Sequence, residues 1–124
     1  MKKIAVYCGS NFGESKTYFD QAQALGHLLA EKNIGLVYGG GKVGLMGAIA
    51  DAVLAAGGHV TGVIPTFLRE LEKAHASLNE LIETADMTER KKRMIELADG
   101  YIAMPGGVGT FEELFEVEIG RAHV

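Results

Sequence analysis

The chain has little cysteine, little proline and no strong excess of charge. Its single cysteine, Cys8, excludes a disulfide within the chain and fits a reducing compartment such as the cytoplasm. Only 2 of the 124 residues are proline, against 17 glycines, and 48% are hydrophobic. This composition is typical of a folded α/β domain and not of a disordered chain. A formal net charge of −4 argues against a broad basic surface for nucleic acid.

Long apolar runs and metal-ligand spacing are also missing. No run approaches the ~20 apolar residues of a membrane span. The apolar residues near the N-terminus break off at Cys8-Gly9-Ser10, too early for a secretory peptide. The four histidines lie without metal-binding spacing at His27, His59, His75 and His123. We therefore expect a soluble, cytoplasmic protein without a metal, with one domain over residues 1–124.

Strand and helix signals alternate along the chain. Short apolar runs predict strands at residues 3–8, 34–38, 59–64, 78–84 and 101–104. Helical spacing and capping residues predict helices at residues 15–31, 44–56, 86–98 and from 110 onward. Residues 66–77 fit either a short helix or a loop. The alternation predicts an α/β fold, a Rossmann-like doubly wound parallel sheet with helices on both faces.

The most informative segment runs from Met104 to Glu113. An apolar strand leads into a loop with three glycines, and the loop meets a helix at Thr110, a typical N-cap. A strand, a glycine loop and a helix start together present backbone N–H groups and the helix dipole to an anion. Helix capping explains one of the two carboxylates, Glu112 and Glu113, but not both. The segment therefore predicts chemistry on a phosphorylated substrate.

Two other strand ends carry glycine-rich turns, at residues 8–10 and 39–44. Gly39, Gly41 and Gly44 match G-x-G-x-x-G, but the next strand lacks the terminal acid that holds a dinucleotide ribose. Lys42 is not followed by serine or threonine, which excludes a Walker A loop. Ligands of doubly wound sheets bind at the carboxyl ends of the strands. The three turns together therefore predict a site for a single phosphate group.

Arg90 lies in the first turn of a helix that Asp86 should cap, with Glu89 at the capping-box position. This helix start should lie at the same ligand-binding edge, where an arginine is suited to bind phosphate through two hydrogen bonds. The basic residues that follow fit a solvated helix face. Cys8 has no evident histidine partner, so it fits a small packed residue better than a nucleophile.

These motifs resemble those of the "lonely guy" family of cytokinin-activating nucleoside 5′-monophosphate phosphoribohydrolases, which are often labelled lysine decarboxylases. Residues 105–113 match the signature P-G-G-x-G-T-x-x-E, and four other segments fit in the same order, at residues 6–10, 38–47, 62–65 and 87–91. The resemblance covers residues 1–117. The family's next segment, Thr-Trp-x-Gln, has no match in residues 118–124, so the chain resembles a C-terminally shortened member.

The resemblance implies that water releases a free base and ribose 5-phosphate from a nucleoside 5′-monophosphate. It implies no cofactor, and a homodimer or larger homo-oligomer with sites near the subunit interface. Arg90 and Glu113 fall at the family's catalytic positions. The other matched positions would bind the substrate: Cys8, Gly9, Ser10, Gly40, Gly41, Gly44, Met46, Glu72, Lys91, Gly106, Gly107, Val108, Gly109, Thr110 and Glu112.

The residue types are consistent with that reaction. Cleavage of an N-glycosidic bond builds positive charge on the ribose ring, and a nearby carboxylate stabilises that charge. Lysine decarboxylation needs a lysine Schiff base with pyridoxal phosphate, for which Lys42 in a phosphate loop is poorly suited. AMP and cytokinin nucleotides both fit as substrates. Two alternatives stay open, namely a non-catalytic nucleotide-binding or cofactor-carrier module and an inactive fragment of the enzyme.

Overall fold

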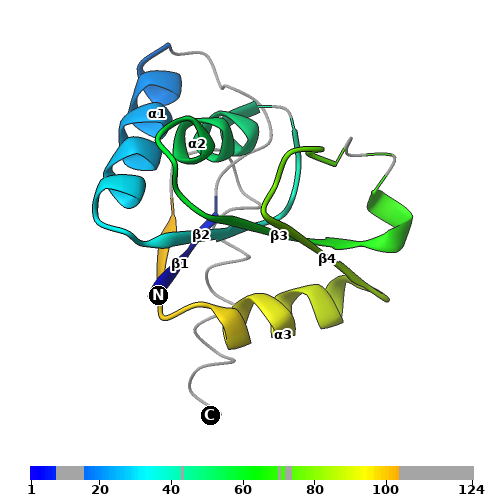
Figure 1. Cartoon of the computed structure of the whole chain (residues 1–124). Helices are drawn as coiled ribbons and strands as arrows, with labels where there is room; N and C mark the ends of the chain where they lie inside the picture. Colours follow the sequence, from blue (N-terminus) through cyan, green and yellow to red (C-terminus); the bar gives the residue numbers. More distant parts are fainter. Residues whose placement is uncertain (8–15, 43, 70, 72–73, 104–124) are drawn as a thin grey trace.

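The computed structural model describes residues 1–7, 16–42, 44–69, 71 and 74–103. These residues form an α/β domain built from short strands and three longer helices (Figure 1). The strands are β1 (Lys3–Tyr7), β2 (Gly35–Tyr38), β3 (Val60–Pro65), β4 (Glu80–Thr84) and β5 (Gly100–Ala103). The helices are α1 (Lys16–Glu31), α2 (Gly44–Ala55) and α3 (Met87–Leu97), with a 3₁₀ turn, η1 (Thr66–Leu68).

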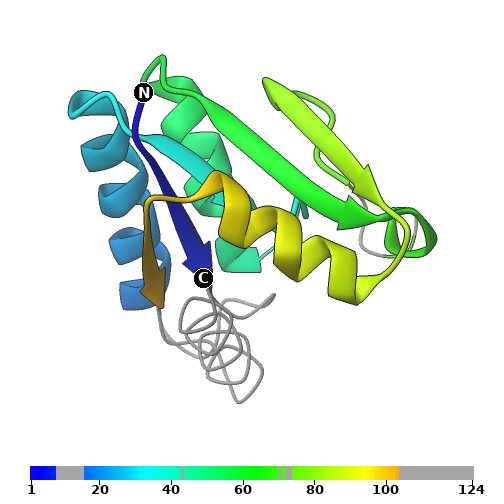
Figure 2. The same ribbon diagram turned by 90° about the horizontal axis from the view of Figure 1, so that it is seen from below.

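The strands form a single parallel sheet in the order β4-β3-β2-β1-β5. The chain winds outward from β1 to β4, and β5 then pairs with the other side of β1. Helices α1 and α2 cover one face of the sheet, and α3 covers the other (Figures 1 and 2). The predicted doubly wound parallel sheet with helices on both faces is therefore confirmed.

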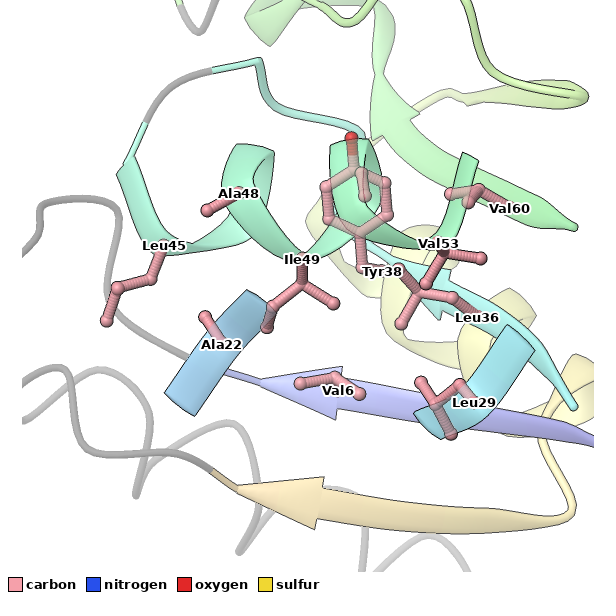
Figure 3. Close-up of a cluster of buried hydrophobic side chains, with 11 residues drawn as sticks. Val6, Ala22, Leu29, Leu36, Tyr38, Leu45, Ala48, Ile49, Val53 and Val60 are labelled. Atoms are coloured by element: carbon pink, nitrogen blue, oxygen red, sulfur yellow. The ribbon is translucent and has the colours of Figure 1, made fainter. Parts of the chain in front are cut away.

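Successive strand residues point to opposite faces, so β1, β2 and β3 each contribute to two separate cores. The larger core lies between the sheet and α1 and α2 (Figure 3), and it contains Val6, Ala22, Leu29, Leu36, Tyr38, Leu45, Ala48, Ile49, Ala50, Val53 and Val60. The smaller core faces α3 and contains Ala5, Tyr7, Val37, Val63, Met94 and Ala98. Burial of both apolar faces fixes the sheet between its helical layers.

Several predicted boundaries shift by one or two residues. β4 begins at Glu80 rather than at residue 78. At Asn79, the residue before it, the side chain contacts β3, because its Oδ1 accepts a hydrogen bond from the Val60 N–H at 2.8 Å. β3 includes Pro65, which pairs with Thr84 as the last residue of the strand. A proline is tolerated there because no further ladder bond has to be donated. Within the described part of residues 66–77, η1 is followed by a loop.

The predicted cap of α3 is confirmed, with one difference in detail. The Asp86 carboxylate accepts a hydrogen bond from the Glu89 N–H at 2.8 Å, as an N-cap does. The Glu89 carboxylate accepts from the Ala85 N–H at 2.7 Å, one residue before the position that the capping box predicts. Both bonds fix the first turn of α3, which carries Arg90.

Candidate phosphate-binding site

The carboxyl ends of the parallel strands lie along one edge of the sheet. β1 and β5 end side by side, since Tyr7 pairs with Ala103. The winding of the sheet reverses between these two strands, which is where ligands of such folds bind. Several predicted site residues follow these ends or lie in the β3–β4 connection, outside the described residues: Cys8, Gly9, Ser10, Glu72, Gly106, Gly107, Val108, Gly109, Thr110, Glu112 and Glu113.

Arg90 is buried at this edge, with 7% of its surface exposed. Its Nε donates to the Val63 carbonyl and its Nη2 to the Gly39 carbonyl, both at 2.9 Å. These two carbonyls lie at or just beyond the carboxyl ends of β3 and β2. A buried charge is costly unless its hydrogen-bonding groups are satisfied. The main chain of two strands therefore holds this guanidinium in a fixed orientation.

The glycine turn after β2 is held on two sides. The Tyr38 hydroxyl donates to the Gly41 carbonyl at 2.7 Å, and the His75 N–H donates to the Gly40 carbonyl at 2.9 Å. Gly41 also forms an isolated antiparallel bridge with Ala74. Gly40 has φ +81°, a left-handed conformation that favours glycine. The chain between β2 and α2 is thus shaped by contacts from both its own strand and the β3–β4 connection.

The described residues bring several predicted substrate contacts into this region. Gly40 and Gly41 lie in the turn, and Gly44 begins α2. A Cβ placed on Gly41 would lie 3.6 Å from the Met46 Cε, so the predicted contact Met46 also lies against the turn. Arg90 reaches the same turn through Gly39, and half-buried Lys91 follows it on α3.

His75 supports the turn through a second pair of contacts that sequence reasoning missed. Its Nδ1 accepts from the Ser77 N–H at 3.1 Å, so its Nε2 carries the proton and donates to the Asp51 carboxylate at 2.6 Å. The His75 side chain is 9% exposed, whereas that of Asp51 on α2 is 67% exposed. No sequence signal connects these two residues, which are 24 positions apart.

A surface pocket of about 410 Å³ lies beside the residues that support the turn. It is lined by Arg69, Ala74, His75, Ala76, Leu78 and Leu81. Arg69 forms an ion pair with Glu83 on β4, and both side chains are exposed. The pocket is therefore lined by both apolar and polar side chains.

The described ranges contain neither a metal-ligand cluster nor a membrane-spanning helix. No cluster of three or more histidine, cysteine, aspartate or glutamate side chains there could hold a metal ion. Among the helices of the same ranges, none combines the length and the apolar character needed to cross a membrane.

A doubly wound parallel sheet with helices on both faces defines a Rossmann-type α/β protein, and the buried arginine and the glycine turn lie at the edge where such folds bind their ligands. Residues 46–121 match the family described as "Possible lysine decarboxylase", and the chain belongs to this family. The matched range ends at residue 121, so it includes the first part of residues 118–124, the segment without a match to Thr-Trp-x-Gln.

Curated relatives carry the name of the reaction that the sequence motifs imply. The chain is 52% identical over 116 residues to cytokinin riboside 5′-monophosphate phosphoribohydrolase LOG2 of Arabidopsis thaliana, covering 94% of this chain and 54% of that protein. It is 49% identical over 117 residues to the enzyme of that name from Rhodococcoides fascians, covering 94% of this chain and 59% of the relative. The resemblance to the "lonely guy" family is thus confirmed. The chain spans between half and three-fifths of the length of these two relatives.

Solved structures show the same fold. The X-ray structure of TM1055, a structural genomics target, has a TM-score of 0.76 and 29% identity, with 94% of this chain and 68% of that chain covered. The molybdenum cofactor binding protein of the phototrophic bacterium Rippkaea orientalis has a TM-score of 0.79 and 23% identity, with 98% and 73% covered. The second likeness concerns the fold alone.

Proposed function

We propose that this chain hydrolyses the N-glycosidic bond of a purine or cytokinin nucleoside 5′-monophosphate. The oxygen of water would bond to C1′ of the ribose as the bond to the base breaks, and the base would leave with a proton. The products are the free base and ribose 5-phosphate. The names of relatives up to 52% identical support this proposal.

The observation that carries the proposal is the buried Arg90 at the ligand edge of the sheet. Its Nε and Nη2 already donate to main-chain carbonyls, so a phosphate would not form its two hydrogen bonds with the Nε side of the guanidinium. A phosphate would be bound end-on, through the two Nη atoms, and would replace the weak acceptor Met87 Sδ, which lies 3.8 Å from Nη1. Held in this way, the charge is preorganised for the anion and needs no rearrangement when the substrate binds.

The remaining roles follow from the family positions. Glu113 would stabilise the positive charge that develops on the ribose ring as the base departs. Glu112 would orient the ribose hydroxyls or the water. The glycine turns after β1, β2 and β5 would hold the phosphate through backbone N–H groups. We propose that no cofactor is needed and that the enzyme works in the cytoplasm as a homodimer or larger homo-oligomer.

Incubation with AMP, followed by chromatography for adenine, tests the proposal. We expect adenine and ribose 5-phosphate from AMP, a similar reaction with a cytokinin nucleotide, and little product from adenosine. Equal rates on AMP and adenosine would remove the phosphate-binding argument. Tight AMP binding without product would favour a nucleotide-binding module, and neither binding nor product would favour an inactive fragment.

Two variants test the residue roles in the same assay. Glu113→Gln keeps the shape of the side chain and removes its charge, and Arg90→Ala removes the guanidinium. We expect both to reduce turnover by a factor of about 1,000 or more while the circular dichroism spectrum stays close to that of the wild type. Wild-type turnover in either variant would refute the role of that residue.

A further inference from the structure

The guanidinium of Arg90 occupies the space in which residue 39 would carry a side chain. A Cβ built on Gly39 would lie 2.0 Å from the Arg90 Nη2, 3.1 Å from its Cζ and 3.7 Å from its Nε. Among the described residues that do not adjoin Gly39 in the chain, these three atoms are the nearest to that position. Non-bonded carbon atoms pack favourably at about 3.5–4.0 Å, so the first contact is far too short. A side chain at position 39 and Arg90 in its observed place exclude each other.

Arg90 has little freedom to avoid such a clash. The atom nearest to the new Cβ, Nη2, donates to the carbonyl of Gly39 itself, and Nε donates to the Val63 carbonyl. Arg90 belongs to the first turn of α3, which Asp86 caps, and it is 7% exposed. Movement of the guanidinium would therefore break at least one bond to a strand end and change where the charge lies.

The backbone of residue 39 does not itself require glycine. The glycines with a left-handed φ in the described ranges are Gly40, Gly44 and Gly57, and Gly39 is not among them. β2 ends at Tyr38, and its pairing to β3 ends at the same residue. An alanine at position 39 would therefore leave the backbone conformation and the strand register possible.

We propose that Gly39 is a positioning residue, whose missing side chain lets Arg90 lie across the ends of β2 and β3. This inference rests on the proposed function, in which Arg90 binds the substrate phosphate. A side chain at position 39 displaces the guanidinium and misplaces its charge relative to the phosphate. A misplacement of about 1 Å in a catalytic group can cost about 100-fold in rate.

Gly39→Ala tests the proposal, and Gly35→Ala is its matched control. Gly35 lies at the opposite end of the same strand, where a new Cβ would meet the Lys3 Cγ and the Met1 Sδ at 3.1 Å, both in flexible side chains, and the His59 carbonyl oxygen at an ordinary contact distance of 3.8 Å. We expect Gly39→Ala to reduce kcat/KM for AMP by about 100-fold and Gly35→Ala to change it by about twofold or less. Equal effects of the two substitutions would overturn the proposal.

A double-mutant cycle shows whether Gly39 acts through Arg90. The dissociation constant for AMP is measured in the wild type, Gly39→Ala, Arg90→Ala and the combined variant. We expect Gly39→Ala to weaken AMP binding strongly in the wild-type background and by no more than about twofold in the Arg90→Ala background, where nothing is left to displace. If Gly39→Ala fails to fold, the combined variant should regain folding. The proposal would be overturned if the combined variant also fails to fold, or if Gly39→Ala weakens AMP binding as strongly in the Arg90→Ala background as in the wild type.

The NMR signal of the Arg90 Nε–H reports the arginine position without any enzymatic turnover. The chain has four arginines, at positions 69, 90, 93 and 121, so the signal is assigned by its loss in Arg90→Lys. We expect slow exchange with water in the wild type, because the Nε–H is buried on the Val63 carbonyl, and a shifted, fast-exchanging signal in Gly39→Ala. An unchanged signal would refute positioning. If Gly39→Ala changes the signal but the wild type itself does not cleave AMP, only the proposed function is refuted.

Discussion

The two faces of the sheet are packed in different ways. On the face covered by α1 and α2, the core consists of apolar side chains, with Tyr38 the largest. On the face covered by α3, the apolar core is smaller, and the start of the helix carries a buried arginine whose Nε and Nη2 donate to main-chain carbonyls. One face contributes mainly stability. The other accepts the cost of a buried charge at the edge where ligands bind.

Each face depends on a glycine for a close approach, but the atom that would be displaced differs. A Cβ on Gly26 of α1 would lie 2.7 Å from the Ala52 Cβ and 2.8 Å from the Ile49 carbonyl oxygen, so it would separate two helices. A Cβ on Gly39 would instead meet the end of one arginine side chain. Substitution at the first glycine should affect folding, and substitution at the second should affect function.

Arg90→Lys should have the largest effect, and on activity. Lysine keeps the charge but has one nitrogen, which cannot bond both strand ends and also grip a phosphate end-on. We expect kcat/KM for AMP to fall about 100-fold, or ~2.7 kcal/mol of transition-state stabilisation. Steady-state kinetics measures this loss. Near-wild-type activity would mean that a point charge is sufficient and that the orientation set by the strand ends is unimportant.

Gly26→Ala should have the next largest effect, and on stability. The new methyl group forces α1 away from α2, so we expect the free energy of unfolding to fall by about 2 kcal/mol, after a gain in helix propensity is allowed for. Urea denaturation measures the change. Gly26→Ala combined with Ala52→Gly should recover part of the loss, and the folded fraction should keep wild-type kcat. A large loss of kcat at unchanged stability would contradict the claim that the face covered by α1 and α2 contributes mainly to stability.

His75→Ala should have an intermediate effect, because His75 connects α2 with the glycine turn. Loss of its contacts to Asp51 and to the Ser77 N–H should lower the free energy of unfolding by about 1 kcal/mol and raise KM for AMP more than it lowers kcat. Asp51→Asn is the matched control, since its amide oxygen still accepts from Nε2. Equal losses in both variants would indicate that the charge of Asp51, and not the hydrogen bond, is what matters.

Thr61→Val should have the smallest effect, and it should stabilise the protein. Thr61 is fully buried on β3, on the same face as Val63, and its Oγ1 has no hydrogen-bond partner within the described part of the chain. Valine has nearly the same shape and removes the unsatisfied hydroxyl, so we expect the free energy of unfolding, measured by urea denaturation, to rise by about 0.5 kcal/mol, with activity unchanged. A loss of stability would show that the hydroxyl has a partner.

The sequence alone predicted the layered fold because its signals are local and periodic. Apolar runs located the strands, and Asp86 with Glu89 located the start of α3. The same reasoning brought Arg90 to the ligand edge, since the helix start must follow a strand end. It did not predict that Val63 and Gly39 would hold the guanidinium, because those contacts span 27 and 51 positions and involve backbone carbonyls that every residue has.

The roles of individual glycines could not be predicted from the sequence either. In the sequence Gly39 belongs to a G-x-G-x-x-G spacing, whereas in space its neighbour is the side chain of Arg90. The contact between His75 and Asp51 depends on how the β3–β4 connection folds back onto α2, and no periodic pattern reports such a contact. Local patterns therefore predicted the elements, whereas the contacts between elements required the structure.

The ratio of kcat/KM for AMP to that for adenosine, measured in the wild type and in Arg90→Lys, tests the central claim most directly. If Arg90 recognises the phosphate, the wild type should prefer AMP by about 100-fold or more, and the variant should lose at least about tenfold of that preference. The same ratio in both proteins, whatever its size, would contradict the claim that the buried arginine at the strand ends is the phosphate site.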